Sequence, residues 1–177
     1  MRRCGRYFLG AVMFGALLAA GCAGRPEKVN VDGVKNLSRD GDVFVCGAIE
    51  PEGLDALAGM GAATVVDVRQ PSEIPEDYSD EVAARGMTYF NVPMASDAMT
   101  DAQAADCLAA LSRASSSPVV IHCAGGSRAG AVYGLWKSMH GGCDADGAVR
   151  LAKQAGMKSD GLERDLRAEI EKRLRRD

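Results

Sequence analysis

The segment PVVIHCAGGSRAG, residues 118–130, decides the fold class of this chain. An apolar run typical of a buried strand, 118–122, leads at once into a cysteine, two glycines, a serine and an arginine, and then into a sequence that favours a helix. A strand that enters a helix through a glycine-rich turn is a basic unit of parallel α/β sheets. The turn also carries Cys123 and Arg128. We therefore expect it to hold the chemistry as well as the fold.

The composition of this turn is suited to binding an oxyanion. In a parallel sheet the carboxyl ends of the strands face the ligand crevice, which places Cys123 there. Small residues let successive backbone N–H groups point into one concavity, and the helix adds the positive end of its dipole. These donors favour the thiolate of Cys123 as a nucleophile, and the planar fork of Arg128 fits two phosphate oxygens. The candidate substrate-binding residues are Ala124, Gly125, Gly126, Ser127 and Arg128. The alternative is a buried cysteine beside an ordinary turn.

Outward from this turn, strands alternate with helices along the chain. Strands are predicted, mostly as continuous apolar runs, at 42–47, 63–69, 87–93 and 118–122. Helices are predicted at 50–61, 77–86, 100–114, 127–142, 144–156 and 159–177. This alternation indicates an α/β fold of three layers, α/β/α, in which a mostly parallel sheet carries helices on both faces.

Length and composition limit the domain count and the class of function. A chain of 177 residues, 47% hydrophobic and 25% charged, is long enough for one domain with its own core, which we place at 37–177. The formal net charge of −3 gives no electrostatic basis for binding nucleic acid. Since His122 and His140 are the only histidines in the sequence, no histidine-ligated metal site and no Ser-His-Asp triad is expected.

The first residues have the features of a secretion signal. Arg2, Arg3 and Arg6 precede an apolar stretch, 7–20, that ends in the small residues AAGC. This stretch is shorter than the roughly 20 residues of a membrane-spanning helix, although an uncleaved anchor stays open as the alternative.

The ending LLAAGC resembles the bacterial lipoprotein signal, in which the cysteine is lipidated and becomes the first residue of the mature protein. The resemblance implies removal of 1–21 and a diacylglyceryl anchor on Cys22, and the polar segment 22–36 suits a flexible tether. The sequence departs from the pattern at Ala19, where leucine is usual, and Ala23 fits sorting to the outer membrane of a Gram-negative host. We expect an exported lipoprotein on the periplasmic face of the envelope.

The remaining cysteines are Cys46, Cys107, Cys123 and Cys143. In an exported protein they are compatible with a disulfide, but their spacing is not that of a small disulfide-stapled domain. Their oxidation state is left open by the sequence.

The stretch HCAGGSR resembles the His-Cys-loop-Gly-loop-Arg signature of cysteine-dependent phosphatases. Over residues 36–159 the wider pattern resembles the beta-lactamase-hydrolase-like phosphatase-like family, bacterial relatives of the dual-specificity phosphatases. The matching stretches are VFVCGAIEPEGLDALAGMGAATVVDVR, MTYFNVPM and VVIHCAGGSRAGAVYGLW. The resemblance implies hydrolysis of phosphate esters through a phosphocysteine on Cys123, without a cofactor. His122 would then position the loop.

The resemblance also implies a general acid, supplied by an aspartate just past the strand that precedes the loop. The segment NVPMASDAMTD offers Asp97 and Asp101. Asp101 falls in the first turn of a predicted helix, where capping and the helix dipole explain an acid, so Asp97 is the candidate for the acid and Asp101 the alternative.

Two departures from the phosphatase signature bear on the reaction. Cys123 and Arg128 enclose four residues where most protein phosphatases have five, a spacing like that of rhodanese-type sulfurtransferases. Ala129 stands where a serine or threonine commonly helps the thiolate leave, so only Ser127 offers a hydroxyl nearby and turnover is expected to be slow.

The segment DVRQPSE also resembles rhodaneses, although a buried ion pair at a strand end explains Asp67 and Arg69 equally well. Two alternatives to the phosphatase therefore stay open: a sulfurtransferase that carries a persulfide on Cys123, and a catalytically weak module that binds phosphorylated ligands. The class of phosphorylated substrate and the oligomeric state are not specified by the sequence.

Overall fold

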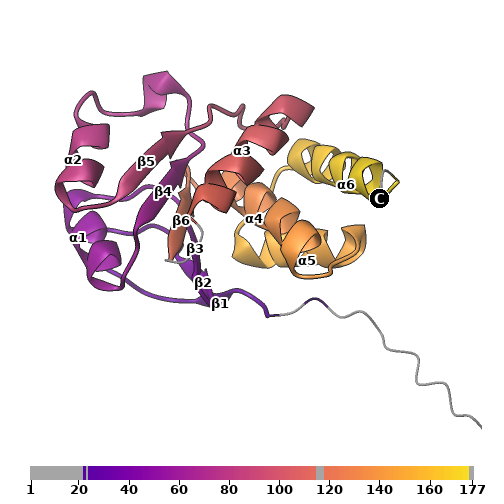
Figure 1. Ribbon diagram of the computed structural model, residues 1–177, viewed down its shortest axis with the longest axis horizontal. Coiled ribbons are helices and arrows are strands. Elements are labelled where there is room, and N and C mark those ends of the chain that lie inside the picture. Colours follow the sequence, from indigo (N-terminus) through magenta and orange to yellow (C-terminus); the bar gives the residue numbers. More distant parts are fainter. Residues whose placement is uncertain (1–21, 23, 115–117, 176–177) are drawn as a thin grey trace, which may run out of the picture.

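A computed structural model describes residue 22 and residues 24–114 and 118–175, and these form three layers (Figure 1). Within this part of the chain a six-stranded sheet has the order β1-β2-β3-β6-β4-β5. The strands are β1 (Glu27–Lys28), β2 (Ser38–Asp40), β3 (Val43–Cys46), β4 (Thr64–Asp67), β5 (Thr88–Asn91) and β6 (Val119–His122). The predicted three-layer fold is confirmed.

The centre of the sheet is parallel and its β1 edge is antiparallel. β6 lies between β3 and β4, and its Val120 pairs with Phe44 on one side and Val65 on the other. All four residues of β6 are buried, because helices cover both faces of the sheet. The loop that follows β6 therefore starts from a strand that is buried on both faces.

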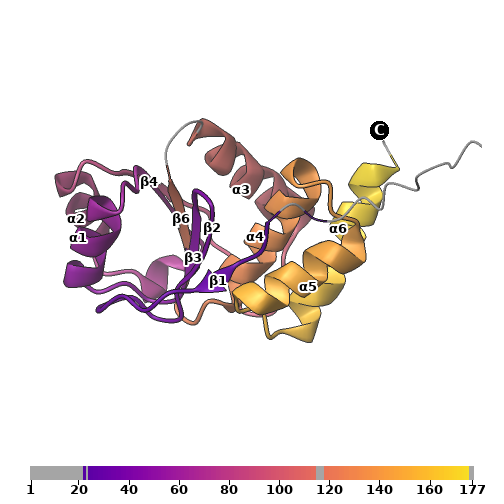
Figure 2. The same ribbon diagram turned by 90° about the horizontal axis from the view of Figure 1, so that it is seen from below.

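Helices cover each face of the sheet (Figures 1 and 2). On one face lie α1 (Pro51–Gly59) and α2 (Tyr78–Ala84), and on the other α3 (Asp101–Arg113), α4 (Ser127–His140), α5 (Ala145–Ala155) and α6 (Asp160–Leu174). All six predicted helices are present with ends within a few residues of those expected. A short 3₁₀ helix, η1 (Pro71–Glu73), follows β4 and was not predicted.

Local sequence explains where these helices begin and how closely they pack. Thr100 and Gln103 form the capping box of α3, in which the Thr100 hydroxyl accepts the Gln103 N–H at 3.3 Å. In α4, a Cβ on Gly134 would lie 2.8 Å from the Cβ of Ala152 and 2.9 Å from the carbonyl of Ala148, both on α5. The glycine therefore lets α5 lie directly against α4.

The N-terminal segment differs from the prediction of a flexible tether at 22–36. β1 pairs with β2 at the edge of the sheet, and Val34 forms a bridge with Ile49. The ordered domain therefore begins before residue 37. The sequence pattern did not reveal β1 because both of its residues are exposed and so carry no apolar alternation.

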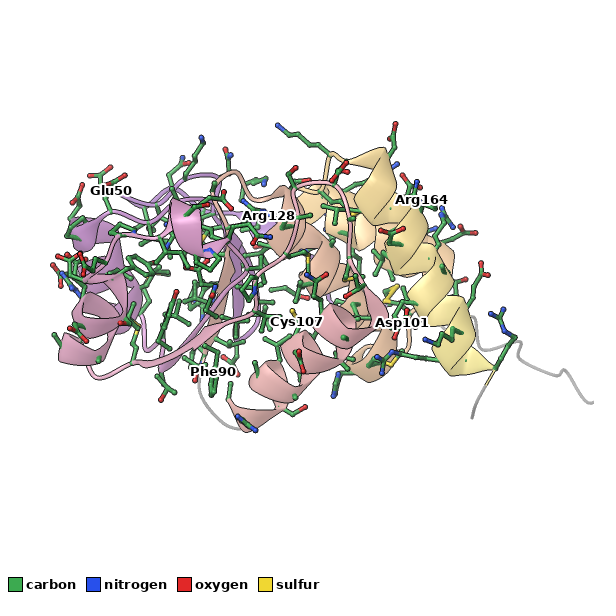
Figure 3. All side chains as sticks on the ribbon, turned by 90° about the horizontal axis from the view of Figure 1, so that it is seen from above. Glu50, Phe90, Asp101, Cys107, Arg128 and Arg164 are labelled. Atoms are coloured by element: carbon green, nitrogen blue, oxygen red, sulfur yellow. A yellow bond between two sulfur atoms is a disulfide. The ribbon has the colours of Figure 1, made fainter. Side chains whose placement is uncertain are left out.

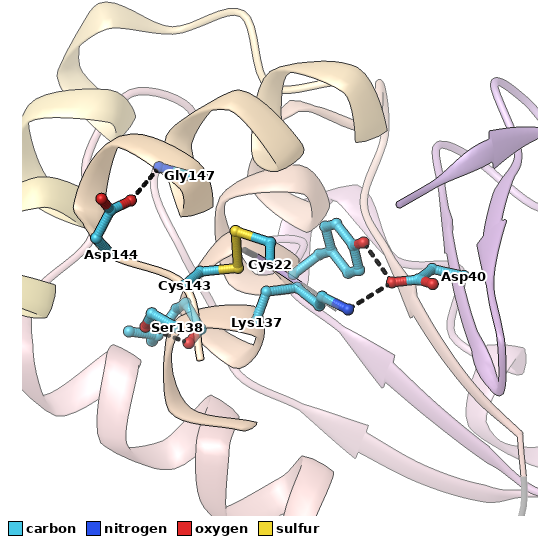
Figure 4. Close-up of a disulfide and its surroundings, with 9 residues drawn as sticks. Cys22, Asp40, Lys137, Ser138, Cys143, Asp144 and Gly147 are labelled. Atoms are coloured by element: carbon cyan, nitrogen blue, oxygen red, sulfur yellow. Dashed lines mark hydrogen bonds and ion pairs between the residues drawn. A yellow bond between two sulfur atoms is a disulfide. The ribbon is translucent and has the colours of Figure 1, made fainter. Parts of the chain in front are cut away.

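Cys22 is joined to Cys143 by a disulfide, which ties this segment to the connection between α4 and α5 (Figure 4). Nearby, Asp40 accepts hydrogen bonds from the Tyr133 hydroxyl at 2.7 Å and from Lys137 at 2.8 Å. A disulfide sulfur cannot also carry the thioether of a diacylglyceryl group. In one molecule, the disulfide and the predicted lipid anchor on Cys22 therefore exclude each other.

The predicted signal peptide, 1–21, lies outside the described residues. Among the helices that are described, none has the length and apolar character needed to cross a membrane.

Candidate active site

The connection between β6 and α4 places Cys123 beyond the carboxyl end of the central strand. Cys123 is 1% exposed, and its Sγ accepts a hydrogen bond from the backbone N–H of Gly126 at 3.1 Å. Gly126 has a φ of 98°, a left-handed conformation that favours glycine, and it is the N-cap of the 14-residue helix α4. The chain therefore curls back over the sulfur immediately before the positive end of the helix dipole.

The other backbone N–H groups of this loop are open to an anion. Between residues 124 and 129, only the N–H of Gly126 has an acceptor among the described residues. Those of 127–129 are first-turn donors, which a helix leaves without internal partners. Because Ala124 and Gly125 are exposed, an anion can approach these donors from solvent. The geometry is that of an oxyanion-binding loop.

Arg128 lies where the sheet meets α4 (Figure 3). Its guanidinium donates to acceptors from other elements. Its Nη1 and Nη2 donate to the carboxylate of Glu73 at 2.7 and 2.6 Å. Nη1 also donates to the backbone carbonyls of Met94 at 3.0 Å and Val68 at 3.3 Å. The side chain of Arg128 is only 7% exposed, so its direction is fixed within the fold.

The Glu73 carboxylate occupies the Nη1–Nη2 end of the guanidinium and leaves the Nε side to other acceptors. The pKa of Arg128 is raised first by the hydrogen bond to Glu73 and further by the charge of Cys123. The hydrogen bond from Arg128 lowers the pKa of Glu73 to about 2. This pair is therefore charged throughout the neutral range.

Glu73 contacts Arg128 in the candidate site, and the sequence did not predict this contact. It belongs to the segment DVRQPSE, for which the sequence analysis noted only a resemblance to rhodaneses. The one local signal is a capping box, in which the Glu73 carboxylate accepts the Gln70 N–H at 2.8 Å. The Asp67–Arg69 ion pair considered for this segment is present at 2.8 Å and is buried.

His122 lies in a buried polar cluster below the loop. Its Nε2 is 3.2 Å from the Tyr78 hydroxyl and 3.4 Å from Asp67 Oδ2, while its Nδ1 has no partner among the described residues. Asp67 also accepts the Tyr89 hydroxyl at 2.9 Å. Burial lowers the pKa of His122 to about 4, so the imidazole is neutral at neutral pH. This placement, directly before Cys123, suits the positioning role expected for His122.

The two candidate acids lie in different surroundings. Asp97 is exposed in the loop after β5, three residues beyond Met94, whose carbonyl contacts Arg128. Asp101 is the first residue of α3 and forms an ion pair with Lys172 of α6 (Figure 3). The fold thus brings the Asp97 segment to Arg128 and engages Asp101 elsewhere.

The Ser127 hydroxyl, which the sequence places near the sulfur, accepts a hydrogen bond from another part of the chain. Ser127 Oγ accepts the backbone N–H of Lys158 at 3.0 Å, which ties the loop to the connection between α5 and α6. Ser127 can still donate its own proton, whereas Ala129 is fully buried and offers no polar group.

A family model described as "Swiss Army Knife protein, DSP-PTPase phosphatase domain" matches residues 47–175. No match was found among curated protein sequences.

Several solved structures share the fold. Tk-PTP in its active form is 23% identical with a TM-score of 0.69, over 81% of this chain and 99% of that one. TpbA of P. aeruginosa is 18% identical with a TM-score of 0.65, over 84% and 89%. The core catalytic domain of the PP-IP phosphatase SIW14 of S. cerevisiae is 17% identical with a TM-score of 0.68, over 83% and 93%.

Proposed function

The chain belongs to the DSP-PTPase phosphatase family, and on that premise we propose that it hydrolyses phosphate monoesters through a phosphocysteine on Cys123. The family makes it a phosphoric monoester hydrolase. The observation that carries the proposed intermediate is the position of Cys123 Sγ, which accepts the Gly126 N–H at the start of α4.

In the first step the Cys123 thiolate attacks phosphorus, and the bond from phosphorus to the leaving oxygen breaks. The open N–H groups of the loop and the Nε side of Arg128 bind the non-bridging oxygens, where charge is greatest in the transition state. Asp97 gives its proton to the leaving oxygen, which departs as an alcohol or phenol.

In the second step water attacks the phosphocysteine and gives a proton to the Asp97 carboxylate. Cys123 leaves as a thiolate and inorganic phosphate is released, so the enzyme returns to its starting state. Because Ala129 offers no hydroxyl to the departing sulfur, this step is the slower one.

The test gives the reduced protein an aryl phosphate in one assay, and thiosulfate with cyanide in the other. Cys123→Ser and Arg128→Ala should both abolish phosphate release. Asp97→Asn should slow it about 100-fold with a poor leaving group and much less with a good one, since a weakly basic leaving group needs little protonation.

The other outcomes separate the alternatives. Formation of thiocyanate without phosphate release, dependent on Cys123 and indifferent to Asp97, would replace the phosphatase by a sulfurtransferase. If neither phosphate nor thiocyanate forms but the protein still binds orthovanadate, the protein is a module that binds phosphorylated ligands.

We further propose that the protein is exported and acts on its phosphorylated substrate from a membrane tether. The support is the basic start, the apolar stretch and the ending LLAAGC. A lipidated molecule must leave Cys143 as a free thiol, because the disulfide uses the same sulfur of Cys22. Expressed in a bacterium, the protein should partition with detergent-extracted membranes, and Cys22→Ala should release it or leave its precursor uncut. Unchanged attachment of that variant would contradict the lipid anchor.

A further inference from the structure

We propose that Asn36 is a positioning residue of the phosphate-binding loop, where its side-chain amide fixes the peptide unit that aims the Gly126 N–H at Cys123. Asn36 lies in the segment that the sequence predicts as a tether, and neither the family signature nor the proposed mechanism gives it a role. The inference rests on the proposed function only in taking the loop as the place where the phosphoryl group binds.

One peptide unit connects Asn36 to the nucleophile. Asn36 Nδ2 donates to the carbonyl of Gly125 at 3.2 Å, across 89 positions of sequence. The peptide between Gly125 and Gly126 is trans, so its N–H points opposite to its C=O. That N–H is the one that donates to Cys123 Sγ at 3.1 Å. Holding the carbonyl outward therefore holds the N–H inward.

The preceding peptide unit is held in the same way. The Ala48 N–H donates to the carbonyl of Ala124 at 3.2 Å, which turns the Gly125 N–H to the opposite side. The sequence Gly125–Gly126 has no side chains to restrict its backbone, so rotation of these peptide units is sterically easy. The two outside donors supply the restriction that the glycines lack.

The position of Asn36 is itself fixed by its neighbour. Lys35 exchanges backbone hydrogen bonds with the strand end at 47–48, through its N–H to Ala48 at 2.9 Å and its carbonyl from Gly47 at 2.7 Å. A Cβ on Gly47 would lie 3.2 Å from the Ala124 carbonyl oxygen, so the glycine makes this close approach to the loop easier. The segment therefore lies directly against the loop.

The backbone at position 36 also limits which residue can stand there. Asn36 has a φ of 55°, the one positive value at a non-glycine residue in the described chain. Asparagine, aspartate and glycine tolerate this conformation best. Of these three, only asparagine can donate a hydrogen bond from its side chain.

The test uses Asn36→Asp and Asn36→Gly, which keep the backbone conformation and remove the donor. Both should weaken orthovanadate binding about 3- to 10-fold, the range expected for one exposed hydrogen bond, and lower kcat/KM by a similar factor. Asn36→Gly adds no charge, so agreement between the two variants excludes simple repulsion of the anion. Asn30→Asp is the matched control, because Asn30 is exposed in the same segment and has no side-chain partner among the described residues.

Two readouts separate positioning from a general role in folding. The variants should keep the melting temperature of Asn30→Asp within a few degrees, and the Gly126 amide resonance of glycine-labelled protein should shift in both. Wild-type orthovanadate affinity in the folded Asn36 variants would overturn the proposal. An equal loss in Asn30→Asp, or a fall in melting temperature with normal binding, would also overturn it.

This test does not depend on turnover. If the wild-type protein binds orthovanadate but releases no phosphate from any ester, the proposed catalytic function fails. The comparison of the Asn36 variants still decides the role of Asn36, because it measures anion binding.

Discussion

Glu73 fixes the direction of the Arg128 guanidinium, the positive charge that we propose binds the phosphate of the substrate. A free arginine side chain loses rotamer freedom when it binds an anion, and this loss opposes binding. The paired contacts from Glu73 to Arg128, at 2.6 and 2.7 Å, remove that freedom during folding. Because they occupy only the Nη1–Nη2 end, the guanidinium is oriented without being blocked.

Glu73→Gln should therefore lower kcat/KM and weaken orthovanadate binding, each by about tenfold. The amide offers one acceptor and no charge where the carboxylate offers two oxygens, so Arg128 loses a charge-assisted pair. Glu76→Gln is the matched control, because Glu76 is exposed in the same connection and has no side-chain partner among the described residues. Equal kinetics for both variants and the wild type would show that the carbonyls of Val68 and Met94 suffice.

The ion pair between Glu73 and Arg128 should make the stability of the protein depend on pH. The pKa of Glu73 is lowered from 4.5 to about 2, so its contribution to stability is fully present above pH 4.5 and is lost as the pH falls toward 2. The melting temperature of the wild type should exceed that of Glu73→Gln at neutral pH, and the difference should shrink between pH 4.5 and 2. A difference that stays constant over this range would contradict the ion pair.

The connection from β6 to α4 depends on one glycine more than on the other. Gly126 has a φ of 98°, a conformation that costs a residue with a Cβ about 1–3 kcal/mol. A Cβ on Gly125 meets nothing within 4 Å, and its φ is not in the left-handed region.

Gly126→Ala should lower the free energy of unfolding and weaken orthovanadate binding, because relief of the strain moves the N–H away from Cys123. Gly125→Ala should retain the stability of the wild type and most of its binding. Urea titration and orthovanadate inhibition measure the two effects. If the two variants behave alike, the loop does not have the backbone conformation described.

The close packing of α4 against α5 can also be tested by substitution. Gly134→Ala places a Cβ against Ala148 and Ala152 of α5, and such overpacking should lower the free energy of unfolding by about 1–3 kcal/mol, even though alanine favours helices. The control is Gly59→Ala at the end of α1, where a Cβ meets nothing within 4 Å and stability should stay equal or rise. Stabilisation by Gly134→Ala in a urea titration would contradict the close approach of α4 and α5.

The elements differ in how far local sequence determines them. β6 and β4 were predicted because strands buried on both faces are mostly apolar, and α3 because Thr100 and Gln103 form a capping box. β1 and β2 could not be recognised, because β1 is a two-residue edge strand with both residues exposed and the three residues of β2 are all polar.

The same limit applies to the site. Cys123 and Arg128 are five positions apart and form a local motif that can be read directly. Glu73 and Asn36 act on that motif from 55 and 89 positions away, and they meet it only through the arrangement of the strands. Their residue types carry no sign of these contacts in the sequence.

In the whole molecule, the C-terminal helices support both loops of the site. The Lys158 N–H donates to Ser127 Oγ, in the proposed phosphate-binding loop, at 3.0 Å. Asp165 of α6 accepts the Met99 N–H at 3.0 Å in the loop that carries Asp97. One layer of helices therefore sets the position of Asp97, the proposed general acid, relative to Cys123.

Near the N-terminus, the reactivity of the Cys143 thiol shows whether Cys22 is lipidated or in the disulfide. In protein extracted from bacterial membranes, Cys143 should react with an alkylating reagent without prior reduction, because a lipidated Cys22 cannot form the disulfide. In Cys22→Ala protein it should react in the same way. Labelling of the membrane-derived protein only after reduction would show that Cys22 is in the disulfide and contradict the lipid anchor.

The central claim is that the phosphoryl group is transferred to Cys123 before water releases it. Trapping this phosphocysteine tests the claim most directly. An aryl phosphate with a good leaving group is mixed with the protein, the reaction is stopped with acid, and the peptides are analysed by mass spectrometry. The account predicts phosphate on the peptide that contains Cys123, more of it in Asp97→Asn because water attack is slowed, and none in Cys123→Ser. Steady release of phosphate with no phosphorylated Cys123, or with phosphate on another residue, would contradict it.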